Sequence, residues 1–123
     1  MYDKCDISVL LGKTLTSIKV YNDQDHLDFY TLDNESYKML HDTDCCEQVW
    51  LEDITGDLCD LLNSPILVAE ERTNSEEAGI ANYDDFYQWT YYELATIKGR
   101  VTLRWYGNSN GYYSVDVSIY KVK

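Results

Sequence analysis

The last forty residues alternate between apolar or aromatic and polar side chains more regularly than any other part of the chain. The alternation runs through residues 87–92, 101–106 and 115–120. A period of two indicates strands that bury one face. The turn sequences Lys98-Gly99 and 107–111 separate the three runs, and both are typical of hairpins. The pattern predicts a three-stranded antiparallel sheet, with 107–111 as a hairpin loop.

The first half of the chain contains shorter runs of the same kind. Polar turn sequences separate residues 15–20, 27–31 and 37–41, which predicts a meander of three antiparallel strands. Residues 46–51 are expected to form a fourth strand. Residues 66–69 are expected to form a buried strand, followed by a polar loop over 73–85.

Two segments favour helical structure. Ile54, Leu58, Leu61 and Leu62 recur at the spacing of one helix face, and Thr55 is the expected N-cap. Residues 6–11 are expected to form a helical turn that ends at Gly12. A chain of 123 residues suits one domain. We therefore predict an α+β fold in a single domain, 1–123, which is mostly an antiparallel β-sheet meander with one or two short helices.

The charge is strongly acidic and unevenly distributed. Ten Lys and Arg against 22 Asp and Glu give a formal net charge of −12, and thirteen of these acids but only one base, Arg72, fall within residues 42–85. Bulk charge of this sign argues against direct binding of nucleic acid or an anionic membrane surface. No apolar run approaches the length of a membrane span. We expect a cytoplasmic protein that needs no cofactor.

Two interpretations of this acidity compete. The acids can simply keep the protein dispersed, although a net charge of about 2–8 is enough for a small domain. Alternatively, they form one negative surface that imitates a phosphate backbone and fits a groove built from Lys and Arg. On that interpretation the residues that bind the partner are Asp42, Asp44, Glu47, Trp50, Glu52, Asp53, Asp57, Asp60, Glu70, Glu71, Glu76 and Glu77.

The segment from His41 to Glu47 is the densest group of residues that could ligate a metal or act as nucleophiles. His41, Cys45 and Cys46 are residue types that could form the active site of a thiol- or metal-dependent enzyme. With 22 acids in the chain, however, some such combination always exists. We favour a half-buried histidine among packed thiols, with all four cysteines reduced and with no catalytic residue and no metal.

Aromatic residues are concentrated towards the end of the chain. Eleven of the seventeen lie within residues 83–120. Cross-strand packing explains part of this enrichment. The alternative is a small-ligand surface, in which the chain acts as a sponge for a nucleotide immune signal. The residues expected to carry that role are Arg100, Arg104, Trp105, Tyr112 and Tyr113.

Four short motifs support a family resemblance: Cys45-Cys46-Glu47, Gly56-Asp57-Leu58, residues 95–99 (ATIKG) and residues 111–114 (GYYS). With them, residues 10–120 resemble a family of small uncharacterised phage and prophage proteins of Gram-positive bacteria. The resemblance carries no established reaction, so no catalytic residue can be transferred from it. It implies a protein that works inside the host bacterial cell.

That setting leads to the functional hypothesis. Small acidic phage proteins often inhibit host defence, so we expect a non-enzymatic anti-CRISPR-type inhibitor. It would bind a basic host protein, a nucleic-acid-binding nuclease, without touching nucleic acid or membrane itself. Exposed sheet edges can also pair between copies of the chain, so a homo-oligomer is a further alternative.

Overall fold

The computed structural model describes residues 2–21, 24–43, 46–77, 86–109 and 114–122, without the side chains of residues 75–77. Within them, antiparallel strands of four to eleven residues and two single-turn 3-10 helices follow one another along the chain. Their bounds are β1 Tyr2–Cys5, η1 Ile7–Leu10, β2 Leu15–Val20, β3 His26–Thr31, β4 Ser36–Leu40, β5 Gln48–Thr55, η2 Leu58–Leu61, β6 Val68–Glu77, β7 Phe86–Thr96, β8 Gly99–Ser109 and β9 Ser118–Val122.

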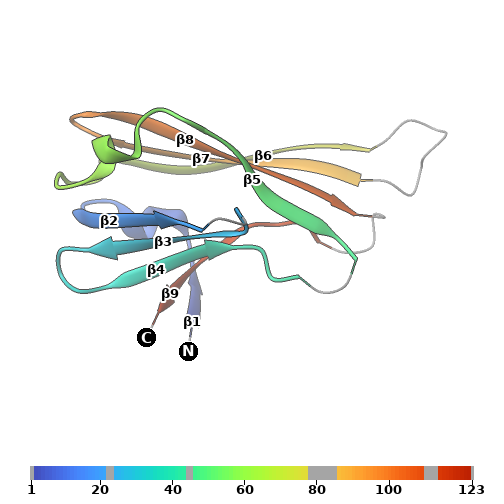
Figure 1. Ribbon diagram of the computed structural model, residues 1–123, viewed down its shortest axis with the longest axis horizontal. Coiled ribbons are helices and arrows are strands. Elements are labelled where there is room, and N and C mark those ends of the chain that lie inside the picture. Colours follow the sequence, from blue (N-terminus) through green and yellow to red (C-terminus); the bar gives the residue numbers. More distant parts are fainter. Residues whose placement is uncertain (1, 22–23, 44–45, 78–85, 110–113, 123) are drawn as a thin grey trace.

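The strands form two sheets that lie face to face as a sandwich (Figure 1). The five-stranded sheet has the order β1-β9-β4-β3-β2, and the four-stranded sheet has the order β5-β8-β7-β6. Every neighbouring pair is antiparallel. The strand-rich, antiparallel character predicted from the sequence is confirmed.

One hydrophobic core lies between the sheets. Leu27, Phe29 and Met39 contribute to it from the five-stranded sheet, and Leu94 and Leu103 from the four-stranded sheet, all completely buried. These residues occupy alternate strand positions, so their neighbours point to the two outer faces. The alternation along each strand therefore determines which side chains point outwards, where they can contact a partner.

The meander and one hairpin agree with the sequence prediction. β2, β3 and β4 are consecutive neighbours, and η1 supplies the helical turn expected before Gly12. β7 and β8 form the expected hairpin, although Thr96 pairs with Gly99, which moves the turn one residue towards the N-terminus.

The predicted α-helix over Ile54–Leu62 is wrong. β5 continues through Thr55, and only the single turn η2 follows. Gly56 has a φ of +105°, which ends the strand and is incompatible with a helix starting at Thr55. The N-cap is Asp57 instead, whose carboxylate accepts a hydrogen bond from the Cys59 N–H at 2.9 Å.

Two further predictions about the second half need correction. β9 does not join β7 and β8 but lies between β1 and β4 in the other sheet, so the connection after β8 crosses between sheets and is not a hairpin loop. β6 extends to Glu77, where a polar loop was expected, because β7 supplies a pairing partner along its whole length. Residues 78–85, the rest of that predicted loop, and 110–113 lie outside the described residues.

No helix in the described ranges has the length and hydropathy needed to cross a membrane.

Candidate functional site

His41 and Glu47 form a buried pair in the connection between β4 and β5. His41 Nε2 lies 2.8 Å from Glu47 Oε2, and His41 Nδ1 lies 2.6 Å from the carbonyl oxygen of Asp116. The side chains are 6% and 0% exposed, respectively. Because both ring nitrogens are engaged, His41 has no free nitrogen for a metal or for activation of a thiol. Within the described part of the chain, no group of three or more His, Cys, Asp or Glu could hold a metal ion.

The cysteines also depart from the expected enzyme site. Cys46 is disulfide-bonded, whereas Cys5 and Cys59 are free thiols. The expectation that all four are reduced is therefore wrong. A disulfide-bonded sulfur is not the thiolate that nucleophilic catalysis needs. Cys45 lies outside the described residues.

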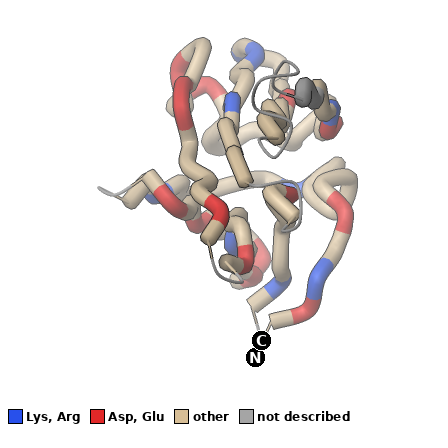
Figure 2. The backbone as a smooth tube through the Cα atoms, turned by 90° about the vertical axis from the view of Figure 1, so that its right-hand side faces the viewer, with Lys and Arg blue, Asp and Glu red and all other residues tan. Residues whose placement is uncertain are grey.

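The predicted acidic residues lie on different parts of the fold. Asp42 follows β4 and accepts a hydrogen bond from the Tyr120 hydroxyl on the five-stranded sheet. Glu47 is buried against His41, so its carboxylate does not lie on the protein surface. Asp57 and Asp60 belong to the η2 turn. Figure 2 shows acidic positions on both layers.

The remaining predicted acids divide between the two sides of the four-stranded sheet. Glu52, Asp53 and Glu70 lie on its outer face, whereas Glu71 points towards the space between the sheets, where it contacts Tyr92. Asp44 lies outside the described residues, as do the side chains of Glu76 and Glu77. The described carboxylates therefore do not gather into one negative surface.

Arginines accompany the carboxylates on this outer face. Arg104 Nε lies 2.8 Å from Glu52 Oε1, and Arg100 Nη1 lies 2.5 Å from Glu93 Oε2. Arg72 lies 3.6 Å from the other oxygen of Glu93 and 5.6 Å from the centre of the Tyr91 ring. Sequence charge counting missed this neutralisation because the partners are separated along the chain and meet only through strand pairing.

Four aromatic side chains meet on the same face. Tyr106 of β8 is in register with Trp50 of β5 on one side and with Trp89 of β7 on the other. Its ring centre lies 5.0 Å from that of Trp50, 5.3 Å from that of Trp89 and 6.2 Å from that of Tyr87. All four side chains are half-buried. This aromatic cluster, Trp50, Tyr87, Trp89 and Tyr106, lies on the side of the sheet that faces away from the core.

Among the residues predicted to bind the partner, only Trp50 belongs to this cluster. The signal for the others was the alternation in residues 87–92, which places Tyr87 and Trp89 on one face and Tyr92 on the opposite one. The alternative nucleotide surface fits less well: Trp105 points into the core and is 1% exposed, and Arg100 and Arg104 are paired with glutamates. Tyr112 and Tyr113 lie outside the described residues.

The five-stranded sheet carries a smaller polar cluster on its outer face. Asp28 is buried there, with Lys38 Nζ at 2.9 Å and the Tyr21 hydroxyl at 2.7 Å. Burial alone would raise the pKa of Asp28, but hydrogen bonds from Lys38 and Tyr21 outweigh it and lower that pKa. The hydrogen bond to Asp28 raises the pKa of Tyr21 to about 12. These internal pairings explain why an acid is tolerated in a covered position.

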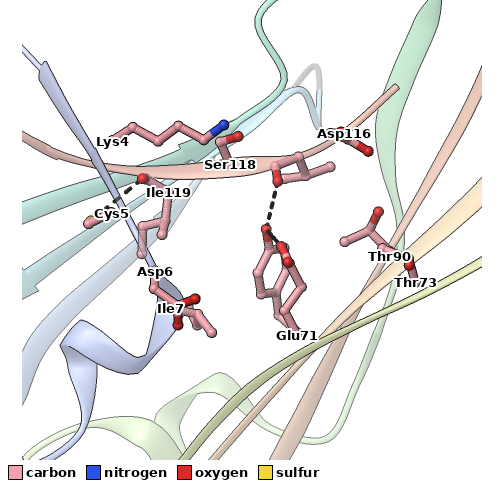
Figure 3. A pocket seen from close by; sticks show the side chains of 12 residues that line it. Lys4, Cys5, Asp6, Ile7, Glu71, Thr73, Thr90, Asp116, Ser118 and Ile119 are labelled. Atoms are coloured by element: carbon pink, nitrogen blue, oxygen red, sulfur yellow. Dashed lines mark hydrogen bonds between the residues drawn. The ribbon is translucent and has the colours of Figure 1, made fainter. Parts of the chain in front are cut away.

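A cavity of about 270 Å³ opens between the two sheets, beside β1 and β6 (Figure 3). Tyr92 lies against it, and its hydroxyl contacts both the Glu71 carboxylate and the Val117 carbonyl oxygen. Burial, reinforced by Glu71, raises the pKa of Tyr92 far above its ordinary value. At this edge of the sandwich, polar groups around the cavity therefore take the place of the apolar side chains that pack in the rest of the core.

These features define an antiparallel β-sandwich with an aromatic outer face and a polar cavity at one edge. The chain belongs to a family described as a domain of unknown function, DUF7448, whose family model matches residues 8–119. That range includes the His41–Glu47 pair and the whole aromatic cluster. No curated protein and no solved structure matches the chain.

Proposed function

We propose that this protein is a binding protein without a catalytic role, which inhibits a basic partner protein by occupying its nucleic-acid groove. The observation that carries the proposal is the aromatic cluster on the outer face of the four-stranded sheet. The proposal keeps the partner class inferred from the sequence but moves the contact surface. In this proposal the dispersed carboxylates of residues 42–85 contribute to the overall negative charge. The outer face of the four-stranded sheet contacts the partner.

The chemistry of the aromatic cluster suits a groove lined by Arg and Lys. Cations are attracted to the faces of Trp and Tyr rings, and each such contact contributes about 0.5–2 kcal/mol. The chain itself contains this interaction, with Arg72 over Tyr91 and Lys19 over Tyr21. Trp, Tyr and Arg are also the residue types that dominate binding energy at protein interfaces. The outer face combines all three types.

Long-range attraction would add to these contacts. A net charge of −12 steers a basic partner towards the protein and accelerates association at low salt. Because the steering arises from the whole charge distribution, it does not require the carboxylates to share one face. In the phage setting that the resemblance implies, a host defence nuclease such as a CRISPR effector is the partner to test first.

The test compares two double variants in binding and nuclease-inhibition assays. Trp89→Ala with Tyr106→Ala removes half of the aromatic cluster, whereas Tyr2→Ala with Tyr30→Ala removes two exposed rings from the five-stranded sheet. We expect the first variant to lose at least about 2 kcal/mol of binding free energy and its inhibition, and the second to match the wild type. Nucleic acid should compete with the wild-type protein for the nuclease.

Equal losses in both variants, or binding that nucleic acid does not displace, would contradict the proposal. Circular dichroism and thermal unfolding of each variant separate loss of the contact from loss of the fold. A nuclease panel that the wild-type protein neither binds nor inhibits would exclude this partner class.

A further inference from the structure

β6 presents a long strand edge that no other strand covers in the part of the chain that the structure describes. It is the outermost strand of the four-stranded sheet, and its ten residues pair with β7 on one side only. Among the described residues, no backbone hydrogen bond beyond that ladder involves residues 68–77. An unpaired row of N–H and C=O groups is a template for an additional strand.

The charge of β6 selects among the strands that could pair with it. Glu70 and Glu71 are exposed at consecutive positions, so they project to opposite faces of the strand. A second copy of this chain would bring the same carboxylates and its own net charge of −12 to the edge. Charged side chains on an edge disfavour such self-pairing. An extended basic segment is complementary to these carboxylates, and the one cation of β6, Arg72, lies 3.6 Å from Glu93 on the outer face.

The cavity lies where the alternate side chains of such a segment would project. Glu71 and Thr73 of β6 line it from the inner face of the sheet, paired in register with Tyr92 and Thr90 of β7. Side chains at directly opposed positions of neighbouring strands lie about 5 Å apart. A strand added to β6 would therefore place every second side chain beside Glu71 and Thr73, at the mouth of the cavity.

The lining of the cavity favours a guest that donates hydrogen bonds. The lining contains three carboxylates, from Asp6, Glu71 and Asp116, and one cationic group, that of Lys4 (Figure 3). Thr90 is also buried in the lining, and among the described residues its hydroxyl takes part in one hydrogen bond, a long one of 3.5 Å from Gln88 Nε2. Ammonium and guanidinium groups carry only donors, which matches this lining.

We propose that β6 is a docking edge for an extended basic segment of a partner protein, which adds a strand to the four-stranded sheet and inserts alternate Lys or Arg side chains into the cavity beside Glu71. Main-chain hydrogen bonds to β6 supply the pairing, and the cavity supplies the preference for basic residues. This inference does not rest on the proposed role of the aromatic cluster, because it uses different residues on another side of the sheet.

The probe is a fluorescein-labelled peptide of alternating Lys and Thr, long enough to pair with residues 70–74. Fluorescence anisotropy should show saturable binding, and hydrogen exchange should slow at amides of β6. A second peptide of identical sequence, N-methylated at alternate residues, keeps every charge but loses backbone donors. We expect it to bind at least about tenfold more weakly, because strand addition depends on those donors.

Glu71→Gln and Glu70→Gln form a matched pair, since both remove one charge from adjacent positions of the same strand. We expect Glu71→Gln to weaken binding of the Lys-Thr peptide about tenfold and Glu70→Gln to change it less than about threefold. Equal effects of the two substitutions, or equal binding of the two peptides, would show unspecific charge attraction and overturn the proposal. Absence of peptide binding to the wild-type protein would also overturn it. Because the two peptides are compared on the unmodified protein, the outcome does not depend on how the variants fold.

Discussion

His41 and Glu47 are hydrogen-bonded to each other, with His41 Nε2 at 2.8 Å from Glu47 Oε2, and both side chains are buried. The other ring nitrogen of His41 reaches the carbonyl oxygen of Asp116, 75 positions further along the chain. The pair therefore fastens the β4–β5 connection to the segment that leads into β9. His41, which the sequence suggested as a member of an enzyme site, therefore holds two distant segments together.

Removal of one member of this pair should destabilise the protein strongly. His41→Ala leaves the buried Glu47 without its ring partner, and we expect a loss of about 3–5 kcal/mol in the free energy of unfolding. Urea titration measures the loss, with Thr43→Ala, an exposed neighbour, as the control that should change little. A His41→Ala protein as stable as the wild type would show that the pair contributes nothing net.

Lowering the pH should reduce the free energy of unfolding through protonation of Glu35. Hydrogen bonds from Lys121 and Lys13 lower the pKa of Glu35 from 4.5 to about 2. The unfolded chain therefore takes up the proton first as the pH falls, so the stabilising contribution of Glu35 is complete above pH 4.5 and disappears as the pH approaches 2. Glu35→Gln should flatten the dependence of unfolding free energy on pH in this interval.

The control for this titration is Glu70→Gln, which also removes one negative charge, at an exposed position of β6, and so separates the loss of the Lys13 and Lys121 contacts from the change in net charge. Chemical denaturation at a series of pH values gives both profiles. If the Glu35→Gln profile had the same slope as the wild type between pH 5 and 2, the assigned role of Glu35 would be wrong.

Two glycines with positive φ should respond differently to alanine. Gly56 has a φ of +105°, and a Cβ there would lie 2.5 Å from the Arg100 carbonyl oxygen. Gly12 has a φ of +80°, and its Cβ would meet no atom within 4 Å. Gly12→Ala should cost about 1–2 kcal/mol from backbone strain alone, and Gly56→Ala clearly more, because β8 must move. Equal urea midpoints for the two variants would contradict this.

The free thiols of Cys5 and Cys59 should react at different rates. Cys59 is exposed, whereas Cys5 is half-buried and its Sγ donates to the Ile119 carbonyl oxygen. Burial raises the pKa of the Cys5 thiol, which reduces its reactive thiolate fraction. We expect a thiol reagent to modify Cys59 quickly and Cys5 slowly in the native protein, as mass spectrometry can measure. Loss of the fast phase in Cys59→Ser assigns it; retention of that phase would refute the assignment.

The sequence was most informative where the interactions are local. The alternation through Leu27 and Phe29, and through Leu103 and Trp105, correctly marks strands and their buried sides, because side-chain direction in a strand depends only on position. The apolar spacing from Ile54 to Leu62 was misleading, since the same residues also fit a strand followed by a turn. There, pairing with β8 and the positive φ of Gly56 decided the outcome.

The amino-acid order alone was sufficient to establish an acidic, antiparallel, strand-rich chain with aromatic residues near its end. Only tertiary structure decided that β9 leaves β8 for the other sheet, that Arg104 neutralises Glu52, and that Trp50 joins Trp89 around Tyr106. The physical reason is that these contacts join residues far apart in sequence. Their geometry depends on strand order and register, which alternating hydrophobicity leaves undetermined.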